Sequence, residues 1–479
     1  MGMNPTSASQ GGINRRTFLG QTAMGTLGLL SVAHLLRSEG RLAAAEPAAG
    51  SPAVKRAPAQ SVICLFQNGG PSQMDLFDPK PFLNRMNGKP YAGKERIESI
   101  MNIQQGKLLG TPFQFKRHGR CGMELSEILP RTAQIADQIT LIRSMFSDSV
   151  CHEASIRQWV GGNTNVVTRP SLGSWLCYGL GSMNANLPAY VVLPDPQGMP
   201  VWEAGNWTHS WLPAAYQATP FIAGGATPVL NLKDPEGTLP AARGNQLRYL
   251  DRLNRRQLVR YADSSELAAR IANFEMAARM QSAIPPVVDL SGEPAAVKKM
   301  YGLDNPTTQA YGTRVLLARR LVEQGVRFVG VYHAGQPWDT HSDNAAATKK
   351  IAGAVDQPSA ALVADLQQRG LLDSTVVLWL GEFGRTPITE GASGRDHSRR
   401  GFSMWLAGGG FKKGYVHGTT DEFGYAAVDK PVSFHQLHAT LLRALGLDHR
   451  NLTFEHEGRL ESLTDSEVTR AEVVHELLE

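Results

Sequence analysis

Short apolar runs alternate along this chain with longer stretches in which apolar residues recur every three or four positions. Six runs of β-branched and other apolar residues predict buried strands, over 61–66, 139–144, 189–193, 326–332, 375–380 and 403–406. The longer stretches predict helices over 124–136, 264–283, 311–324, 345–368 and 434–445. Buried strands that alternate with helices favour an α/β/α sandwich with a mostly parallel central sheet.

The pattern weakens in the middle of the chain and changes near its end. Residues 195–260 are rich in Trp, Pro and Gly and show no period, so we expect long loops there, within a loop-rich insertion over 195–300. We expect the main domain to span 60–450 and a C-terminal tail to follow over 451–479.

The first 45 residues have the parts of a bacterial export signal. Arg15-Arg16 opens a twin-arginine-like motif, a weakly apolar stretch follows over 21–36, and small residues stand at 43–45. The alternative is an amphipathic helix with a chance pair of arginines. We therefore expect a signal peptide over 1–45, an Ala/Pro-rich linker over 46–59, and a periplasmic or secreted protein exported by the twin-arginine route. No later apolar run is long enough to span a bilayer, so no integral membrane span is expected after cleavage.

Composition and charge exclude several classes of protein. The chain has 479 residues, 42% of them hydrophobic, which is typical of a globular protein and not of a collagen-like or disordered one. Its formal net charge is +5, of which four arginines and one glutamate in residues 1–45 contribute +3. No run of five or more Lys/Arg occurs, so no nucleic-acid partner is expected. The four cysteines match no zinc-binding spacing and are taken as structural.

Polar residues cluster where the predicted strands end. Asp75 follows the first strand and His152 the second, Asp339 and His341 follow 326–332, Glu382 and Arg385 follow 375–380, and Arg395, Asp396 and His397 stand just before 403–406. Ligands bind at the carboxyl ends of strands in a parallel sheet, so these side chains are expected around one cleft. Carboxylates and imidazoles are ligands of Zn²⁺ and, with fewer histidines, of Mn²⁺ or Ca²⁺. The sequence thus predicts a divalent metal site.

Four segments together resemble one known family. They are Gly69-Gly70-Pro71-Ser72-Gln73-Met74-Asp75, with the residues that follow to Pro81, then Trp338-Asp339-Thr340-His341, Gly381-Glu382-Phe383-Gly384-Arg385-Thr386-Pro387, and Gly394-Arg395-Asp396-His397. On these residues the chain resembles the exported bacterial family recorded as domain of unknown function 1501, from about residue 60 to 450. That family is labelled sulfatase-like and placed in the alkaline phosphatase/sulfatase superfamily. The resemblance implies an alkaline phosphatase-like fold with a metal site at the strand ends.

The superfamily's metal ligands carry over only in part. The resemblance implies that Asp339, His341 and His397 hold a first metal, and we expect these three to form the closest group. For a second metal, Glu382 stands in the place of an Asp and Phe383 in the place of a His. After the first strand, Gln67-Asn68 stand where the superfamily has a metal-binding Asp, and the nearest acid is Asp75.

The position of the nucleophile also departs from the superfamily pattern. It falls on Cys151 or His152, and the segment Cys151-His152-Glu153-Ala154-Ser155 lacks the proline of the sulfatase motif. His152 is therefore a candidate nucleophile, proton carrier or metal ligand, or simply a polar residue that starts a helix.

Two functions remain open. The first is a metal-dependent hydrolase of sulfate or phosphate esters, on small molecules or polysaccharides, in which Arg385 or Arg395 would hold anionic oxygens. The second is a catalytically silent binding or assembly protein with the same fold, which the missing ligands and nucleophile favour. The sequence does not indicate an oligomeric state.

Overall fold

The computed structural model describes residues 59–93, 96–98, 106–224, 228–229, 232, 234, 238–261 and 265–479. The predicted export signal over 1–45 and all but the last residue of the predicted linker lie outside these residues. Residues Arg56–Glu479 form one unit, and the description below concerns that unit.

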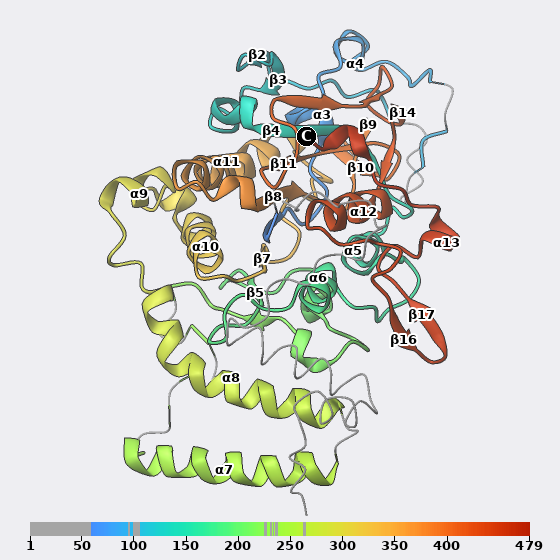
Figure 1. Ribbon diagram of the computed structural model, residues 1–479. Helices are drawn as coiled ribbons and strands as arrows, with labels where there is room; N and C mark the ends of the chain where they lie inside the picture. The colour runs from blue at the N-terminus through green and yellow to red at the C-terminus, as the bar shows by residue number, and fades with distance from the viewer. Residues whose placement is uncertain are drawn as a thin grey trace, which may run out of the picture. The chain divides into compact units, whose positions relative to one another are not determined.

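A nine-stranded sheet lies at the centre of the described residues, in the order β12-β4-β11-β8-β1-β7-β5-β6, with β15 also paired to β4 (Figure 1). Its strands are β1 (Ser61–Phe66), β4 (Ile139–Phe146), β5 (Tyr190–Leu193), β6 (Thr219–Pro220), β7 (Phe328–Val331), β8 (Thr375–Leu380), β11 (Phe402–Ala407), β12 (Tyr415–His417) and β15 (Val432–Ser433). The pairs within the sheet are parallel, except that β11 is antiparallel to both β4 and β8. All six predicted strands are present in it.

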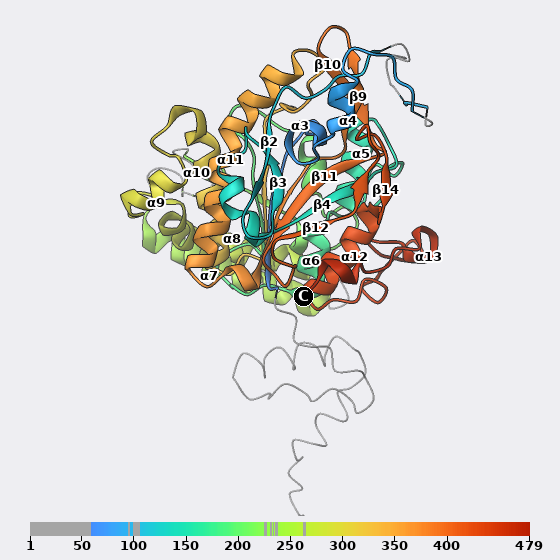
Figure 2. The same ribbon diagram turned by 90° about the horizontal axis from the view of Figure 1, so that it is seen from above.

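Alternate residues of each strand enter two separate cores, one on each face of the sheet. In β1, Ile63 and Leu65 pack in the core under α10 (Pro306–Glu323) and α11 (Asn344–Gln368). Val62, Cys64 and Phe66 pack in the opposite core, under α5 (His152–Gly161), α6 (Leu172–Leu180) and α12 (Phe434–Ala444). Figure 2 shows these two groups of helices on either side of the strands. Because both faces are covered, the central strands β1, β7 and β8 are almost entirely apolar, and the predicted α/β fold with a mostly parallel central sheet is confirmed.

Further helices and four small strand pairs lie outside this framework. The helices are α3 (Gln73–Leu76), α4 (Pro81–Arg85), α7 (Pro240–Arg260), α8 (Ser265–Val288), α9 (Ala295–Met300) and α13 (Ser466–Thr469), and the small strand pairs are β2 (Phe115–His118) with β3 (Met123–Ser126), β9 (Gly384–Glu390) with β10 (Gly394–Ser398), β13 (Thr419–Thr420) with β14 (Ala427–Asp429), and β16 (Phe454–His456) with β17 (Arg459–Glu461). Toward the C-terminus, Leu463 and Leu477 are buried in the core under α12. Within the described residues, no helix combines the length and apolarity needed to cross a bilayer.

Two expectations from the periodicity are wrong. Residues 124–136 are not an α-helix: Met123–Ser126 pair with β2 as strand β3, and Thr132–Gln138 form a 3-10 helix. Pro130 lies between the two and interrupts any continuous helix. The loops expected over 195–260 end in a helix of 21 residues, α7. That helix has no fully buried face and therefore shows no apolar period.

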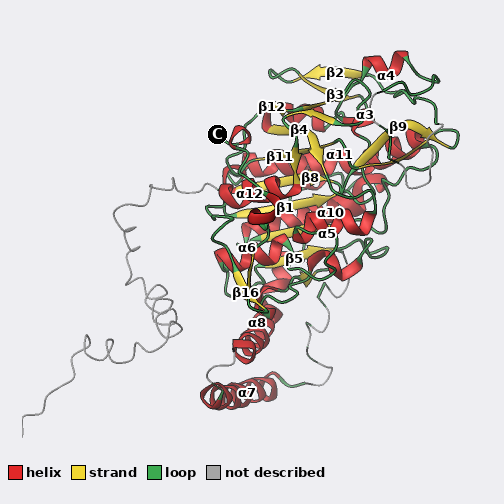
Figure 3. Cartoon of the chain, turned by 90° about the vertical axis from the view of Figure 1, so that its right-hand side faces the viewer, coloured by secondary structure: helices red, strands yellow, loops and turns green. Residues whose placement is uncertain are grey.

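The direction of β11 places a further loop at the edge of the sheet where β1, β4, β7 and β8 end. The carboxyl ends of β1, β4, β7 and β8 lie at one edge of the sheet because these strands run the same way. Since β11 is antiparallel to its neighbours, its first residue, Phe402, lies at that same edge, opposite Met145 near the end of β4. The hairpin of β9 and β10, which directly precedes β11, is therefore held beside the loops that follow the parallel strands (Figure 3).

Candidate metal centre

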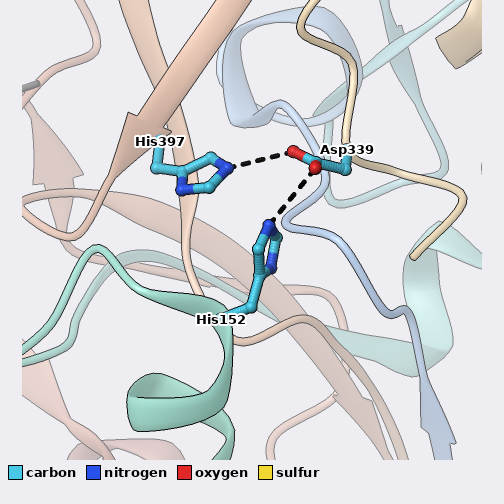
Figure 4. A group of neighbouring side chains, drawn as sticks. All are labelled: His152, Asp339 and His397. Atoms are coloured by element: carbon cyan, nitrogen blue, oxygen red, sulfur yellow. Dashed lines mark hydrogen bonds and ion pairs between the residues drawn. The ribbon is translucent and has the colours of Figure 1, made fainter. Parts of the chain in front are cut away.

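Three imidazoles converge on the carboxylate of Asp339. Asp339 and His341 lie on the loop after β7, His152 is the first residue of α5, and His397 lies on β10. Asp339 Oδ1 is 2.9 Å from Nε2 of His341 and 3.0 Å from Nε2 of His397, and these two nitrogens are 3.0 Å apart. Nε2 of His152 lies 3.4 Å from the other carboxylate oxygen, Oδ2 (Figure 4).

The second nitrogen of each ring faces an acceptor. Nδ1 of His152 lies 2.6 Å from Oε1 of Glu382, and Nδ1 of His397 lies 2.7 Å from the carbonyl oxygen of Val150. Nδ1 of His341 contacts the carboxylate of Glu390. A carbonyl or an ionised carboxylate only accepts, so each Nδ1 carries the proton and donates it. The neutral tautomer of all three rings therefore leaves a lone pair on Nε2.

These lone pairs point at one another and at a carboxylate. Such a group of acceptors is repulsive unless protons or a cation lie between its members. Two ligands of a tetrahedral metal with bonds of about 2.0–2.1 Å lie about 3.3 Å apart, close to the spacings found here. Nε2 of His152 is buried and makes no hydrogen bond of good geometry with any described residue. The donor set and its spacing therefore fit a divalent ion, with each imidazole oriented from behind as metal-bound histidines are.

The electrostatics of the group favour positive charge beside Asp339. Burial alone would raise the pKa of Asp339, but its contacts with His152, His341 and His397 outweigh this and hold the pKa well below the usual range. Burial would lower the pKa of His152, yet the carboxylates of Asp339 and Glu382 raise it to about 9. The contact with Asp339 raises the pKa of His341, whereas burial lowers that of His397. The carboxylates thus favour positive charge on His152 and His341, whereas His397 favours its neutral form.

Two overlapping groups of three residues could hold an ion. They are His152, Asp339 and His397, and His341, Asp396 and His397, with candidate ligand atoms within 4.8 Å of one another in each group. His397 belongs to both. Among the residues predicted to bind metal, the structure thus brings together Asp339, His341, Asp396 and His397.

Glu382 and Asp75, which were also predicted to bind metal, belong to neither of these two groups. Both oxygens of Glu382 accept from the backbone N–H of Gly69, at 2.9 and 3.1 Å, in addition to the bond from His152. Asp75 is fully buried and pairs with Arg395, whose Nε is 3.0 Å from Asp75 Oδ2. Glu382 therefore lies behind His152, and Asp75 lies outside both metal-capable groups.

The two predicted anion-binding arginines face the protein interior. Arg385 is fully buried, and its Nη2 donates to Asp339 Oδ1 at 2.7 Å. Its remaining donors reach the backbone carbonyls of Gly69, Gly70, Trp338 and Arg395. Arg395 donates to Asp75 and to the carbonyl of Thr386. Both guanidiniums thus hold the loops that carry the centre.

Sequence reasoning missed two groups behind the histidines. Glu390 ends β9, and only the β9–β10 hairpin and the loop after β7 together bring it to His341. The carbonyl of Val150 has no sequence signal at all.

Cys151, the other candidate nucleophile, is exposed, and its thiol donates to the carboxylate of Glu153 at 3.1 Å. Partial burial of the sulfur together with that carboxylate raises the pKa of the thiol. A raised pKa is the opposite of what a nucleophilic cysteine needs.

Comparison with known proteins identifies the family and distant structural relatives. No curated protein matches the sequence. Among solved structures, the PsFucS1 sulfatase from Pseudoalteromonas sp. is 13% identical, with 88% of this chain and 71% of that chain covered and a TM-score of 0.33. The TAB5 alkaline phosphatase, in a mutant form with Mg bound, is 12% identical, with 82% and 100% covered and a TM-score of 0.36.

A third structure is the C-terminal periplasmic domain of EcEptC from Escherichia coli in complex with Zn, at 9% identity, 85% and 92% coverage and a TM-score of 0.36. Likenesses this distant say nothing about activity. A family match does cover most of the chain, over residues 59–478. The chain therefore belongs to the DUF1501 family, described as a protein of unknown function.

Proposed function

We propose that this chain binds one divalent metal ion through Asp339, His341 and His397 and hydrolyses a sulfate or phosphate ester. The observation that carries the proposal is the convergence of two imidazole lone pairs and a carboxylate oxygen within 3.0 Å of one another. The site is open to solvent on the side of His341, whose side chain is 35% exposed, so a substrate could reach it from there. His397 lies deeper, with its side chain 6% exposed. A bound ion would act as a Lewis acid that polarises the ester and offsets developing charge.

The chain's own residues have separate tasks in this proposal. Arg385 holds Asp339 in place, and Glu390 and the carbonyl of Val150 fix the two ligating rings. His152 moves a proton at Nε2 while Glu382 keeps its Nδ1 protonated, the arrangement expected of a general acid–base histidine. The substrate is a small-molecule or polysaccharide ester.

Metal content and hydrolysis measured together test the assignment. We expect about one equivalent of metal in the purified mature chain by mass spectrometry, and its loss in His341→Ala and in His397→Ala. The double variant should lose little more than either single one, because each deletion already opens the same site. His152→Ala should retain metal but lose hydrolysis of p-nitrophenyl phosphate or sulfate. His475→Ala, at an exposed histidine elsewhere, is the matched control.

Two results would contradict this assignment. Two equivalents per chain would refute the one-ion arrangement. No metal after reconstitution with Zn²⁺, Mn²⁺ or Ca²⁺ would make a catalytically silent binding protein the better account. That alternative is favoured by one observation already made, the inward orientation of both candidate anion-binding arginines.

A further inference from the structure

Helix α7 lies outside the layered framework. Figures 1 and 3 show α8 between α7 and the rest of the unit, with α7 as the outermost helix on that side. The residues of α7 whose exposure is described are all exposed or half-exposed. A helix of 21 residues that buries so little apolar surface gains little stability from packing. Packing against the rest of the unit therefore does not explain which residues this helix contains.

The two sides of α7 differ in composition. Its half-exposed positions, among them Leu247, Asp251 and Leu258, recur at spacings of three and four and form a single seam. The opposite side carries Arg248, Arg252, Arg256 and Arg260, which are all exposed. Because they are four residues apart, these arginines lie one above the other in a row along the helix. We call this row the arginine row.

Most of the positive charge of α7 has no carboxylate partner among the residues that the structure describes. The helix contains six arginines and one aspartate, a net charge of +5, which equals the formal net charge of the whole chain. Arg243 pairs with Asp234 and Arg255 with Asp251, each at 2.9 Å. The four members of the arginine row form no ion pair with a carboxylate of the described residues. Like charges at this spacing destabilise a helix.

Large apolar side chains accompany the arginine row. Tyr249, Leu253 and Val259 are 56%, 36% and 83% exposed, and by helical spacing they lie on the side opposite the seam. The guanidinium of Arg252 lies 6.0 Å from the ring centre of Tyr249. Cationic and apolar groups therefore share one exposed surface about 18 Å long, from Arg248 to Arg260, at a rise of about 1.5 Å per residue.

We propose that α7 docks this protein on an anionic phospholipid surface through the arginine row and the apolar residues beside it. Guanidinium groups match the geometry of lipid phosphates and can bind them with two hydrogen bonds. Leu253 and Val259 would enter the boundary between headgroups and acyl chains, which is how helices of this composition lie on membranes. A second copy of the chain is a poor partner because two such rows would repel each other. A sulfated polysaccharide matches the arginines but leaves these aliphatic side chains exposed.

The placement of α7 leaves the metal centre free. In Figure 1, α7 lies at the bottom of the view, whereas β9 and β10, which carry Glu390 and His397, lie near the top. Docking through α7 would hold the protein on a surface without covering the centre. The proposal does not depend on any catalytic activity.

Flotation of the purified mature chain with lipid vesicles tests the proposal. Vesicles of equal parts phosphatidylglycerol and phosphatidylcholine should bind the protein, and vesicles of phosphatidylcholine alone should not. Each arginine near an anionic surface contributes about fivefold to the binding constant, so replacing all four by Gln should weaken binding several hundredfold. Raising the salt concentration to 0.5 M should also release the wild type, since it screens these charges. Leu253→Asn with Val259→Asn should weaken binding at low salt while leaving its salt dependence intact.

A matched variant controls for net charge. Replacing Lys116, Arg117, Arg120 and Arg131 by Gln removes four exposed cations near β2, which Figure 1 shows at the opposite end from α7, and should leave binding unchanged. Circular dichroism checks that every variant is folded. Equal binding to both kinds of vesicle, or full binding by the α7 quadruple variant, overturns the proposal. So does binding to dextran sulfate without binding to phosphatidylglycerol vesicles, which would assign α7 to a polyanionic polysaccharide.

Discussion

Replacing Arg395 by Gln tests whether this residue supports the structure or binds a substrate anion. Its guanidinium and the carboxylate of Asp75 are both fully buried, with Arg395 Nε 3.0 Å from Asp75 Oδ2. That carboxylate also accepts from Ser72 Oγ at 2.5 Å and from Asn344 Nδ2 at 2.8 Å. The substitution removes the cation and leaves a buried negative charge with two neutral donors.

The expected loss of stability is substantial but not fatal. Removing one member of a buried ion pair costs about 3–5 kcal/mol, and the two remaining donors favour the lower end, about 3 kcal/mol. A domain of ordinary stability, about 5–15 kcal/mol, would still fold. Adding Asp75→Asn removes the uncompensated charge, so the double variant should recover about 1–2 kcal/mol of the loss.

The pH dependence of the loss follows from the pKa of Asp75. Burial alone would raise that pKa, but Arg395 with the bonds from Ser72 and Asn344 lowers it in the wild type. The wild-type pair therefore stabilises the fold above the unfolded pKa of about 3.9, and this contribution is lost as the pH falls through and below that value. Without Arg395, burial raises the pKa, so the penalty is present above that raised value and is relieved as the pH falls through it.

Urea denaturation followed by tryptophan fluorescence measures both effects. The free energy of unfolding of Arg395→Gln should lie about 3 kcal/mol below wild type at pH 7, with a smaller gap at pH 5. An unchanged unfolding free energy together with weakened binding of phosphate or sulfate would refute this reasoning and make Arg395 an anion-binding residue.

Three further predictions concern export, protons and the groups behind the histidines. Arg15→Lys together with Arg16→Lys should leave precursor in the cytoplasm, as an immunoblot of cell fractions would show; normal processing would instead indicate a general secretory signal. Zinc affinity, measured by competition with a chromogenic chelator, should rise between pH 7 and pH 9. The pKa of His152 is raised to about 9, and its proton must leave if an ion is to bind beside it. An affinity that does not change with pH would mean that His152 lies outside the ion's reach. Glu390→Gln should weaken metal retention about tenfold, because His341 loses the carboxylate behind Nδ1; an unchanged affinity would show that this contact does not position the ring.

The local pattern of apolar and polar residues was sufficient to predict the strands of the central sheet and part of the candidate metal centre. A strand buried on both faces must be apolar throughout, so β1 and β8 could be predicted with the bounds that the structure has. Asp339 and His341 lie on the loop that follows the predicted strand over 326–332, so they could be placed at its carboxyl end on the same grounds. The family motifs along the chain were likewise readable without any structure.

Tertiary structure alone decided which of the candidate residues face one another. His397 precedes a strand, and it reaches the centre only because β11 runs antiparallel to its neighbours, a direction that apolar periodicity does not encode. Arg385 and Arg395 are indistinguishable from anion-binding arginines in sequence, but burial turns both guanidiniums toward protein acceptors. Helix α7 shows no apolar period because it lacks a buried face, so its arginine row became visible only when the helix itself was placed. Periodicity reports whether a residue is buried, whereas the partner of a buried or exposed charge depends on strand direction and on contacts between residues distant in sequence.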